Sequence, residues 1–405
     1  MSTINTNTIS LNAQRNLQAT SVNLATTIQR LSSGLRINSA RDDAAGLAIS
    51  ERFSTQIRGL NVATRNANDG ISLAQTAEGG LNEIGNNLQR IRELAVQSAN
   101  ATNSASDRSA LNAEVTQLVA EIDRVAKQSE FNGTRLLDGS FLGQLFQVGA
   151  NAGQAIAISR TANAQANALG GATFDTRAES AIVSGAASAA FQITNIQISG
   201  NGLPAAVTLG PIQVNIGDTA AAVTGRIAAA INERIGETGV FAAAGGAGGT
   251  DLTFSSVRES LTSAGAFQGI AVSRGSATGT VSGLTFTAAG AANTAAPAGN
   301  PVFLDRLDIT TVVGAGQALA IIDRGLTTVN GARADLGAVQ NRFSSVVANL
   351  GTSAENLSAS CSRIRDADYA RETAELTRTQ ILQQAGTAML AQANQIPQNV
   401  LTLLR

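Results

Sequence analysis

Apolar residues recur at helical spacing along both ends of this 405-residue chain, and the two end stripes share a seven-residue period. The N-terminal stripe has leucines seven residues apart and two residues at an interleaved position: Leu17, Leu24, Leu31, Ile28 and Leu35. The C-terminal stripe also repeats every seven residues: Leu382, Met389, Ile396 and Leu403. Seven-residue apolar repeats are typical of a coiled-coil seam. The pattern therefore predicts that both ends are helices and that they pair with each other.

Further helical patterns lie next to both ends. Apolar residues keep helical spacing in four segments: 49–60, 71–95, 111–125 and 321–350. Gly34 and the polar run 38–43 predict a break between the first two helices, and the cluster 100–107 predicts a turn. Pro397 falls inside the last predicted helix, where its ring is expected to kink the helix or remove a hydrogen bond.

The middle of the chain changes to the two-residue period of strands. A hairpin is predicted over 146–159, and short alternating runs follow at 191–198, 212–216, 252–254, 270–272 and 284–286. One helix, near 219–234, interrupts these runs. The alternation favours an inserted α+β domain over the disorder that a Gly- and Ser-rich composition would otherwise indicate.

The predicted fold is mainly α with an inserted α+β domain, and its helical parts are discontinuous in sequence. Residues 1–43 with 363–405 form the terminal coiled coil. Residues 44–173 with 304–362 form a helical bundle with a β-hairpin, and 174–303 form the inserted domain.

Both ends are almost free of charge. Arg15 is the only charged residue before Arg30, and the segment 379–404 has none, although both ends are rich in Asn, Gln, Ser and Thr. A solvated surface helix usually carries charges on its polar face, and a membrane helix would not carry so many amides. The ends are therefore predicted to pack against copies of themselves. Ordering about 40 residues costs roughly 40–80 kcal/mol, while burying one stripe returns ~10–20 kcal/mol, so we expect disordered ends in the free chain.

Composition excludes several functions. The chain has no His and one Cys, which removes His-based catalysis and the usual metal ligand sets, and no cofactor motif is present. A net charge of −1 gives no basic surface for nucleic acid. No apolar run is long enough for a membrane span, and the first seven residues do not read as a secretory signal peptide. An enzyme is thus a poor alternative.

Several long motifs, in order, resemble bacterial flagellin. They cover about the first 170 and last 100 residues: Leu31–Gly46, Gln89–Ser98, Phe131–Gly133, Ile364–Ala370 and Ala393–Arg405. A weaker resemblance, to a repeat of flagellins and hook-associated proteins, is carried by Ala228–Asn232 with Thr238–Val240. The alternatives are a hook–filament junction protein, a cap component, or a non-flagellar coiled-coil adhesin.

The resemblance implies a subunit that polymerises into the extracellular flagellar filament for motility. The terminal coiled coil would line an inner tube, the helical bundle would form the outer wall, and the inserted domain would face solvent. Export would run through the flagellar type III apparatus as an unfolded chain. Implied partners are other flagellins, the filament cap, hook-associated junction proteins, a secretion chaperone, a host Toll-like receptor and an intracellular flagellin sensor.

The resemblance also implies two epitopes. The Toll-like receptor surface would consist of residues on two neighbouring helices: Gln89, Arg90, Leu94, Gln97 and Glu114. The intracellular sensor would read the last residues: Val400, Leu401, Leu403, Leu404 and Arg405. From the residues alone, Arg90 and Glu114 read better as an ordinary helix-face pair, and Leu94 also fits a core position.

Polar residues cluster at the break between the first two helices: Arg36, Asn38, Arg41, Asp42 and Asp43. A solvated loop is one interpretation, and the charge density favours interdomain or intersubunit salt bridges. Cys361 departs from the flagellin pattern, which has a polar residue between Ser360 and Ser362. A buried small side chain, an engineered labelling or cross-linking site, and a natural substitution that shifts filament packing are the three interpretations of Cys361.

Overall fold

The computed structural model describes residues 6–159, 161–179, 183–246, 249–273, 276–278, 285–286 and 301–403, with the backbone only at 183–184, 276–278, 285–286 and 396–403. The chain divides into two compact units. Unit 1 comprises Met1–Asp69, Leu145–Ile156 and Arg342–Arg405, and unit 2 comprises Gly70–Gln144 and Ala157–Asn341. The three-part division expected from the sequence stays a prediction.

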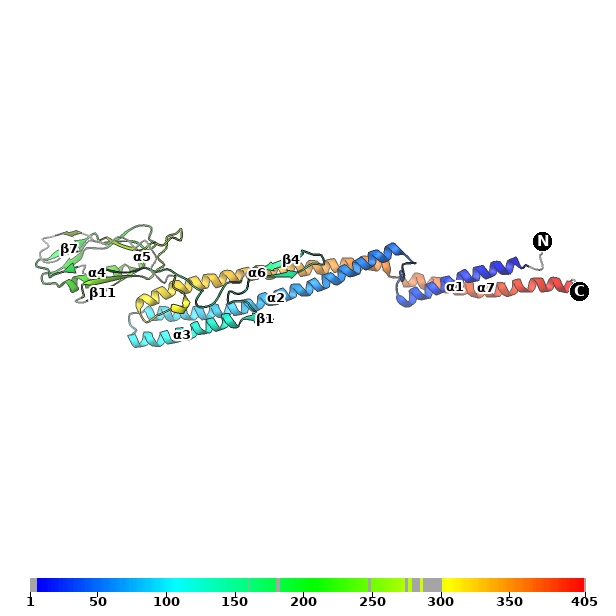
Figure 1. Cartoon of the computed structure of the whole chain (residues 1–405), viewed down its shortest axis with the longest axis horizontal. Coiled ribbons are helices and arrows are strands. Elements are labelled where there is room, and N and C mark those ends of the chain that lie inside the picture. Colours follow the sequence, from blue (N-terminus) through cyan, green and yellow to red (C-terminus); the bar gives the residue numbers. More distant parts are fainter. Residues whose placement is uncertain are drawn as a thin grey trace. The chain divides into compact units, whose positions relative to one another are not determined.

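Long helices make up about half of the chain (Figure 1): α1 (Thr8–Ser33), α2 (Ala44–Ala99), α3 (Ala105–Gln128), α6 (Val312–Arg365) and α7 (Tyr369–Leu403). The sequence indicated separate helical segments within 49–95, whereas α2 is one helix of 56 residues. The backbone of α7 is helical through Pro397.

Local side chains and glycines set the helix ends. Gly34, in the left-handed conformation with φ of 69°, ends α1, as expected for a glycine after a last turn. Ser104 and Asp107 form a capping box that starts α3 after the predicted turn. Asp368 Oδ1 accepts a hydrogen bond from the backbone N–H of Ala370 at the start of α7.

The core of unit 2 begins with one face of α2. Six side chains on this face are buried: Leu81, Ile84, Leu88, Ile91, Leu94 and Ala95. Leu88 also packs near Gly325 of α6, and Arg92 of α2 bonds Asp323 of α6 at 2.8 Å. This face has the helical spacing that the sequence predicted for the segment.

Two small hairpins accompany the helices. Strands β1 (Glu130–Phe131) and β2 (Thr134–Arg135) pair antiparallel around Asn132 and Gly133, whose φ values are 49° and 75°. An Asn-Gly pair with positive φ is the usual chemistry of a tight hairpin turn. Strands β3 (Gln144–Gln147) and β4 (Ala155–Ile158) form the second hairpin, which lies within the predicted range apart from its first two residues.

The inserted region holds short strands and two helices. In chain order these are β5 (Thr176–Glu179), β6 (Val183–Ser184), β7 (Phe191–Thr194), β8 (Gln197–Gly200), β9 (Val207–Thr208), β10 (Ile212–Val214), α4 (Ala220–Glu233), α5 (Ile235–Thr238), β11 (Val240–Gly245), β12 (Asp251–Ser256), β13 (Ile270–Ser273), β14 (Ser276–Thr278) and β15 (Thr285–Phe286). A 3-10 turn, η1 (Leu304–Arg306), precedes α6.

The strands form small antiparallel sheets rather than one large sheet. The three-stranded sheets have the orders β10-β7-β14, β11-β12-β5 and β13-β8-β9, and β15 pairs with β6. Their inner faces pack with α4 into one core that includes Phe191, Val223, Ile231 and Phe254. The region is therefore the α+β insertion that the sequence predicted.

The prediction of one strand over 191–198 was wrong. Asn195, with φ of 62°, separates β7 from β8, and the two strands belong to different sheets. Asn tolerates this left-handed conformation better than most residues. The chain turns there, and the apolar alternation shifts phase at the same point, from 191 and 193 to 196 and 198. Strand β11 was not predicted, because its Ala- and Gly-rich sequence has weak strand propensity. Of the run predicted at 284–286, Leu284 lies outside the described residues.

Candidate assembly surfaces

In unit 1, α1 and α7 lie side by side along their lengths (Figure 1). On α1 the buried and half-buried side chains include a stripe with alternating steps of three and four residues: Ser10, Ala13, Leu17, Thr20, Leu24, Thr27 and Leu31. The corresponding stripe on α7 has the same steps: Glu372, Leu376, Thr379, Gln383, Gly386, Leu390 and Ala393. Each stripe is a continuous heptad seam.

The seam differs in composition from the predicted one. Leu17, Leu24 and Leu31 occupy it, but the interleaved positions are Thr20 and Thr27 instead of Ile28, which is 50% exposed. Leu35 lies beyond the end of α1, in a backbone bridge with Asp366.

On α7 the predicted stripe runs one residue before the seam. Leu382 and Met389 precede the seam residues Gln383 and Leu390, and they are 46% and 65% exposed. The side chains of Ile396 and Leu403 are outside the described residues. The apolar stripe of the C-terminal helix therefore lies on the flank of the seam and is partly exposed, as far as the structure describes it.

Small residues take the place of leucine at several positions of the seam. A Cβ atom on Gly386 would lie 3.2 Å from Leu17 Cδ1, so the position has little room for a side chain. Thr27 and Thr379 are buried, and each hydroxyl donates to the carbonyl four residues earlier, at 3.0 and 2.8 Å. Their polar atoms are thus satisfied inside the seam.

Polar contacts tie the free end of the helix pair. Asn7 Nδ2 donates to the Ala393 carbonyl at 2.8 Å, while Asn7 Oδ1 accepts from the Ser10 N–H at 3.0 Å and caps α1. The Ser10 hydroxyl lies 2.8 Å from Asn394 Oδ1. These bonds fix the register of the seam with uncharged groups.

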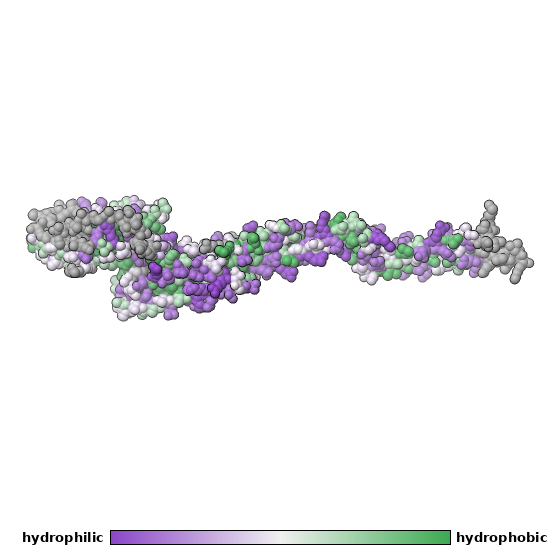
Figure 2. All heavy atoms as spheres, viewed as in Figure 1, coloured by the Kyte–Doolittle hydropathy of each residue, from purple (hydrophilic) through white to green (hydrophobic). Residues whose placement is uncertain are grey.

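Large apolar side chains remain on the outside of the pair. Besides Tyr369 at the start of α7, those at least 46% exposed are Ile9, Leu11, Val22, Ile28, Ile381, Leu382 and Met389. On the face shown in Figure 2, green apolar residues lie among purple polar ones along these helices. Ile9, Leu17, Leu382 and Met389 line part of a groove of about 620 Å³ between the helices. An isolated pair thus leaves much of its apolar surface in water.

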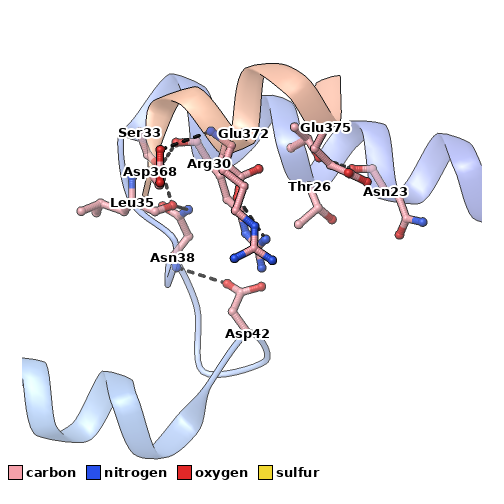
Figure 3. A network of polar contacts seen from close by, with 12 residues as sticks. Asn23, Thr26, Arg30, Ser33, Leu35, Asn38, Asp42, Asp368, Glu372 and Glu375 are labelled. Atoms are coloured by element: carbon pink, nitrogen blue, oxygen red, sulfur yellow. Dashed lines mark hydrogen bonds and ion pairs between the residues drawn. The ribbon is translucent and has the colours of Figure 1, made fainter. Parts of the chain in front are cut away.

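The break between α1 and α2 is a hydrogen-bonded loop. Asp42 Oδ2 accepts from the N–H groups of Asn38 and Ser39 at 3.2 and 2.9 Å, and from the Ser39 hydroxyl at 3.0 Å. These bonds, those from Ser39 first, hold the pKa of Asp42 below its ordinary value, and the nearby Arg30 charge adds to the effect. Figure 3 shows Arg30 beside Asp42 and Glu372. Arg30 and Glu372 form an ion pair at 3.4 Å.

The other predicted loop residues mostly bond to backbone. Arg36 Nη2 donates to the Ile364 carbonyl at 2.5 Å, and Asn38 Nδ2 donates to the Leu35 carbonyl at 2.9 Å. Asp43 Oδ1 accepts from the Gly46 N–H at 2.8 Å and caps α2. Arg41 makes no hydrogen bond or ion pair within the described residues. In that part of the chain none of these five residues forms a salt bridge, so an intersubunit role stays a prediction.

The predicted receptor epitope is split by burial. Arg90 donates two hydrogen bonds to Glu114 Oε1, at 3.0 and 2.9 Å, and one to Glu93 at 3.0 Å. These bonds, the one with Glu114 first, raise the pKa of Arg90. Gln89 and Gln97 are exposed, but Leu94 is only 1% exposed and belongs to the core. Leu94 therefore packs in the core, which was one of the two interpretations of this residue, and the receptor epitope stays a prediction.

The second epitope and Cys361 have different outcomes. For Val400, Leu401 and Leu403 the structure gives only the backbone of α7, and Leu404 and Arg405 lie outside the described residues. Cys361 is half-buried, with its sulfur 3.9 Å from the Ser50 carbonyl oxygen on α2.

No cluster of three or more metal-ligating side chains occurs within the described ranges. Among the helices described, none is long and apolar enough to cross a membrane.

Comparison with known proteins assigns the chain. The family described as the bacterial flagellin N-terminal helical region matches residues 4–141, and the bacterial flagellin C-terminal helical region matches residues 319–404. B-type flagellin of Pseudomonas aeruginosa is 41% identical over 100% of this chain and 99% of its own length. Flagellin D of Vibrio anguillarum is 42% identical over 99% of both chains.

Two solved structures are also similar to this chain. FliC from Burkholderia pseudomallei is 30% identical, over 68% of this chain and 100% of its own, with a TM-score of 0.37. The flagellar hook associated protein-3 from Legionella pneumophila is 16% identical, over 78% of this chain and 98% of its own, with a TM-score of 0.40. The chain belongs to the bacterial flagellin family and is a structural subunit of the flagellar filament.

Proposed function

We propose that the paired terminal helices drive polymerisation of this chain by completing their packing against the same helices of neighbouring copies. One observation carries the proposal. The seam inside the pair is rich in small and polar residues, while larger ones such as Ile381 and Met389 are 60% and 65% exposed. Burial of apolar surface is the main favourable term in protein association, so the pair gains most when neighbours cover this surface.

The uncharged surface supports the same role. Arg15 is the only charge in α1 before Arg30, and α7 has none after Arg378. Packing helices of many copies together would bury any charge, which costs several kcal/mol per unpaired ion. An uncharged surface of amides and hydroxyls avoids this cost and still keeps its contacts with water or neighbours.

Polymerisation then fits a secreted filament that transmits motor torque for swimming. Export as an unfolded chain through the flagellar type III apparatus is compatible with the single cysteine, which precludes an internal disulfide. The filament cap, hook-associated junction proteins and a secretion chaperone would meet the chain on this route. The alternative, another flagellar axial protein of the junction type, uses the same terminal helices.

Host recognition is proposed for the exposed residues only. A Toll-like receptor would contact Gln89, Arg90, Gln97 and Glu114, which are exposed on neighbouring helices, without direct contact to the buried Leu94. An intracellular flagellin sensor would read the segment 400–405.

The test is seeded growth of the purified chain followed by electron microscopy and limited proteolysis. We expect long helical tubes, with both ends of the chain protected in tubes and cut first in the free chain. Discrete rings or particles in place of tubes would overturn the filament role. Ends that resist protease equally in free chain and tubes would overturn the role of the terminal pair.

A further inference from the structure

The two units of the chain carry opposite net charge. Unit 1 contains 13 Arg and nine Asp or Glu, and unit 2 contains 15 Arg or Lys and 20 Asp or Glu. The net charges are therefore +4 for unit 1 and −5 for unit 2, although the whole chain has a net charge of only −1.

Ion pairing within the chain is distributed unequally as well. Within the described residues, nine basic side chains of unit 2 form ion pairs: Arg90, Arg92, Arg124, Lys127, Arg135, Arg177, Arg226, Arg234 and Arg324. Among the described residues of unit 1, only Arg30, Arg365 and Arg378 form ion pairs. Unit 1 thus keeps a surplus of arginines without carboxylate partners.

Two of these arginines without carboxylate partners lie on one face of α2 in unit 1. Arg58, Val62 and Arg65 are spaced four and three residues apart, so they lie on the same face of the helix. All three are exposed, Val62 to 45%. Arg65 makes no hydrogen bond or ion pair in the described chain, and Arg58 only reaches the Ser54 carbonyl at 3.4 Å.

Unit 2 has exposed carboxylates that likewise lack bonding partners within the described residues. Glu83 on α2 and Asp335 on α6 make no hydrogen bond or ion pair within the described residues. Gln340 of α6 bonds Glu78 of α2 at 2.8 Å, and the two helices run antiparallel. Glu83 lies five residues after Glu78 on α2, and Asp335 lies five residues before Gln340 on α6. Because the two helices are antiparallel, both steps lead the same way along the bundle, so Glu83 and Asp335 stand at the same height.

We propose that the Arg58–Val62–Arg65 face of one copy docks on the acidic region around Glu83 and Asp335 of another copy. This inference rests on the proposed polymerisation and names a second contact for it, apart from the terminal helices. A contact between two different surfaces of the same protein is heterologous, and such contacts generate open helical polymers. Charge complementarity selects the partner and its orientation, while Val62 supplies apolar surface at the centre of the face.

A charge-swap experiment tests the docking. The first variant is Arg58→Glu with Arg65→Glu, and the second is Glu83→Arg with Asp335→Arg. Each has like charges on both surfaces, so each alone is expected to raise the critical concentration for seeded polymerisation about tenfold, which is the effect of 1.4 kcal/mol. Mixed in equal amounts, the variants can alternate with opposite charges in contact, and the critical concentration is expected to return to near that of wild type.

Controls separate this contact from the filament role itself. Arg234→Glu, in the inserted region, changes an exposed arginine in the same way and is expected to leave the critical concentration unchanged. Circular dichroism of each free variant checks that its helices are intact. A mixture that polymerises no better than either variant alone would overturn the docking, as would variants that each polymerise like wild type. Wild-type chain that forms no tubes would overturn the proposed function.

Discussion

Replacing Met389 with glutamine separates folding of the chain from its assembly. Met389 is 65% exposed on the outer side of α7, and burying a whole Met side chain contributes about 1.5–3 kcal/mol. Assembly therefore has about 1–2 kcal/mol to gain at this position in each subunit. Since 1.4 kcal/mol corresponds to a factor of ten, Met389→Gln is expected to raise the critical concentration roughly 5- to 30-fold.

The free chain is expected to tolerate the same change. Glutamine has nearly the helix propensity of methionine, and exposed substitutions usually change the free energy of unfolding by less than about 0.5 kcal/mol. The assay measures the protein left in the supernatant after seeded growth and sedimentation, with circular dichroism melts of the free chain beside it. A change in the melting temperature without a change in the critical concentration would refute the reasoning.

A matched control removes general hydrophobicity as the cause. Ile216 is 72% exposed in the inserted region, so Ile216→Gln makes a similar change away from the terminal helices. Its critical concentration is expected to stay within about twofold of wild type, well below one factor of ten. Equal effects of the two substitutions would show that Met389 has no special place in assembly.

Three further predictions concern folding. Leu94→Ala should lower the free energy of unfolding by about 2–5 kcal/mol in denaturant titrations, because Leu94 is 1% exposed. Val96→Ala, at a 51% exposed site, should lower it far less. Equal losses would contradict the assignment of Leu94 to the core. Hydrogen bonds with Ser104 lower the pKa of Asp107. Its contribution to stability is therefore present above the unfolded-state pKa and lost as pH falls through the folded-state pKa. Asp107→Asn should flatten that part of the acid dependence of the melting temperature, and an unchanged profile would count against the cap. Gly386→Ile should separate α1 from α7 and speed proteolysis of both ends. Gly351→Ile should not, because a Cβ at Gly351 meets nothing within 4 Å. Equal cleavage of both variants would exclude the tight packing of Gly386 against Leu17.

The sequence predicted the helices and the insertion because both depend on local periodicity. It predicted the seam leucines of α1 correctly but the wrong stripe on α7, because a seven-residue repeat of large apolar residues looks the same whether it faces the partner helix or not. Thr27, Gly386 and Ala393 carry no such signal, although their small size lets the helices approach closely. The outward stripe of Leu382 and Met389 is the stronger pattern in the sequence, and we assign it to contacts between copies.

Burial at single positions was also beyond the sequence. Arg90 and Glu114 had two interpretations, and only their placement on neighbouring helices identified the ion pair. Leu94 fits a core or a surface position equally well until the packing of α2 is known. At Asn195 the alternation of apolar residues shifts by one position, and this shift together with the residue type was the signal for the turn.

In the proposed filament, the exposed apolar side chains of the terminal pair become buried between copies. A helical reconstruction of tubes grown from this chain, at a resolution that shows side chains, measures this directly. We expect Leu382 and Met389, which are 46% and 65% exposed in the single chain, to be covered there by helices of neighbouring subunits. Tubes in which both side chains face open solvent would contradict it.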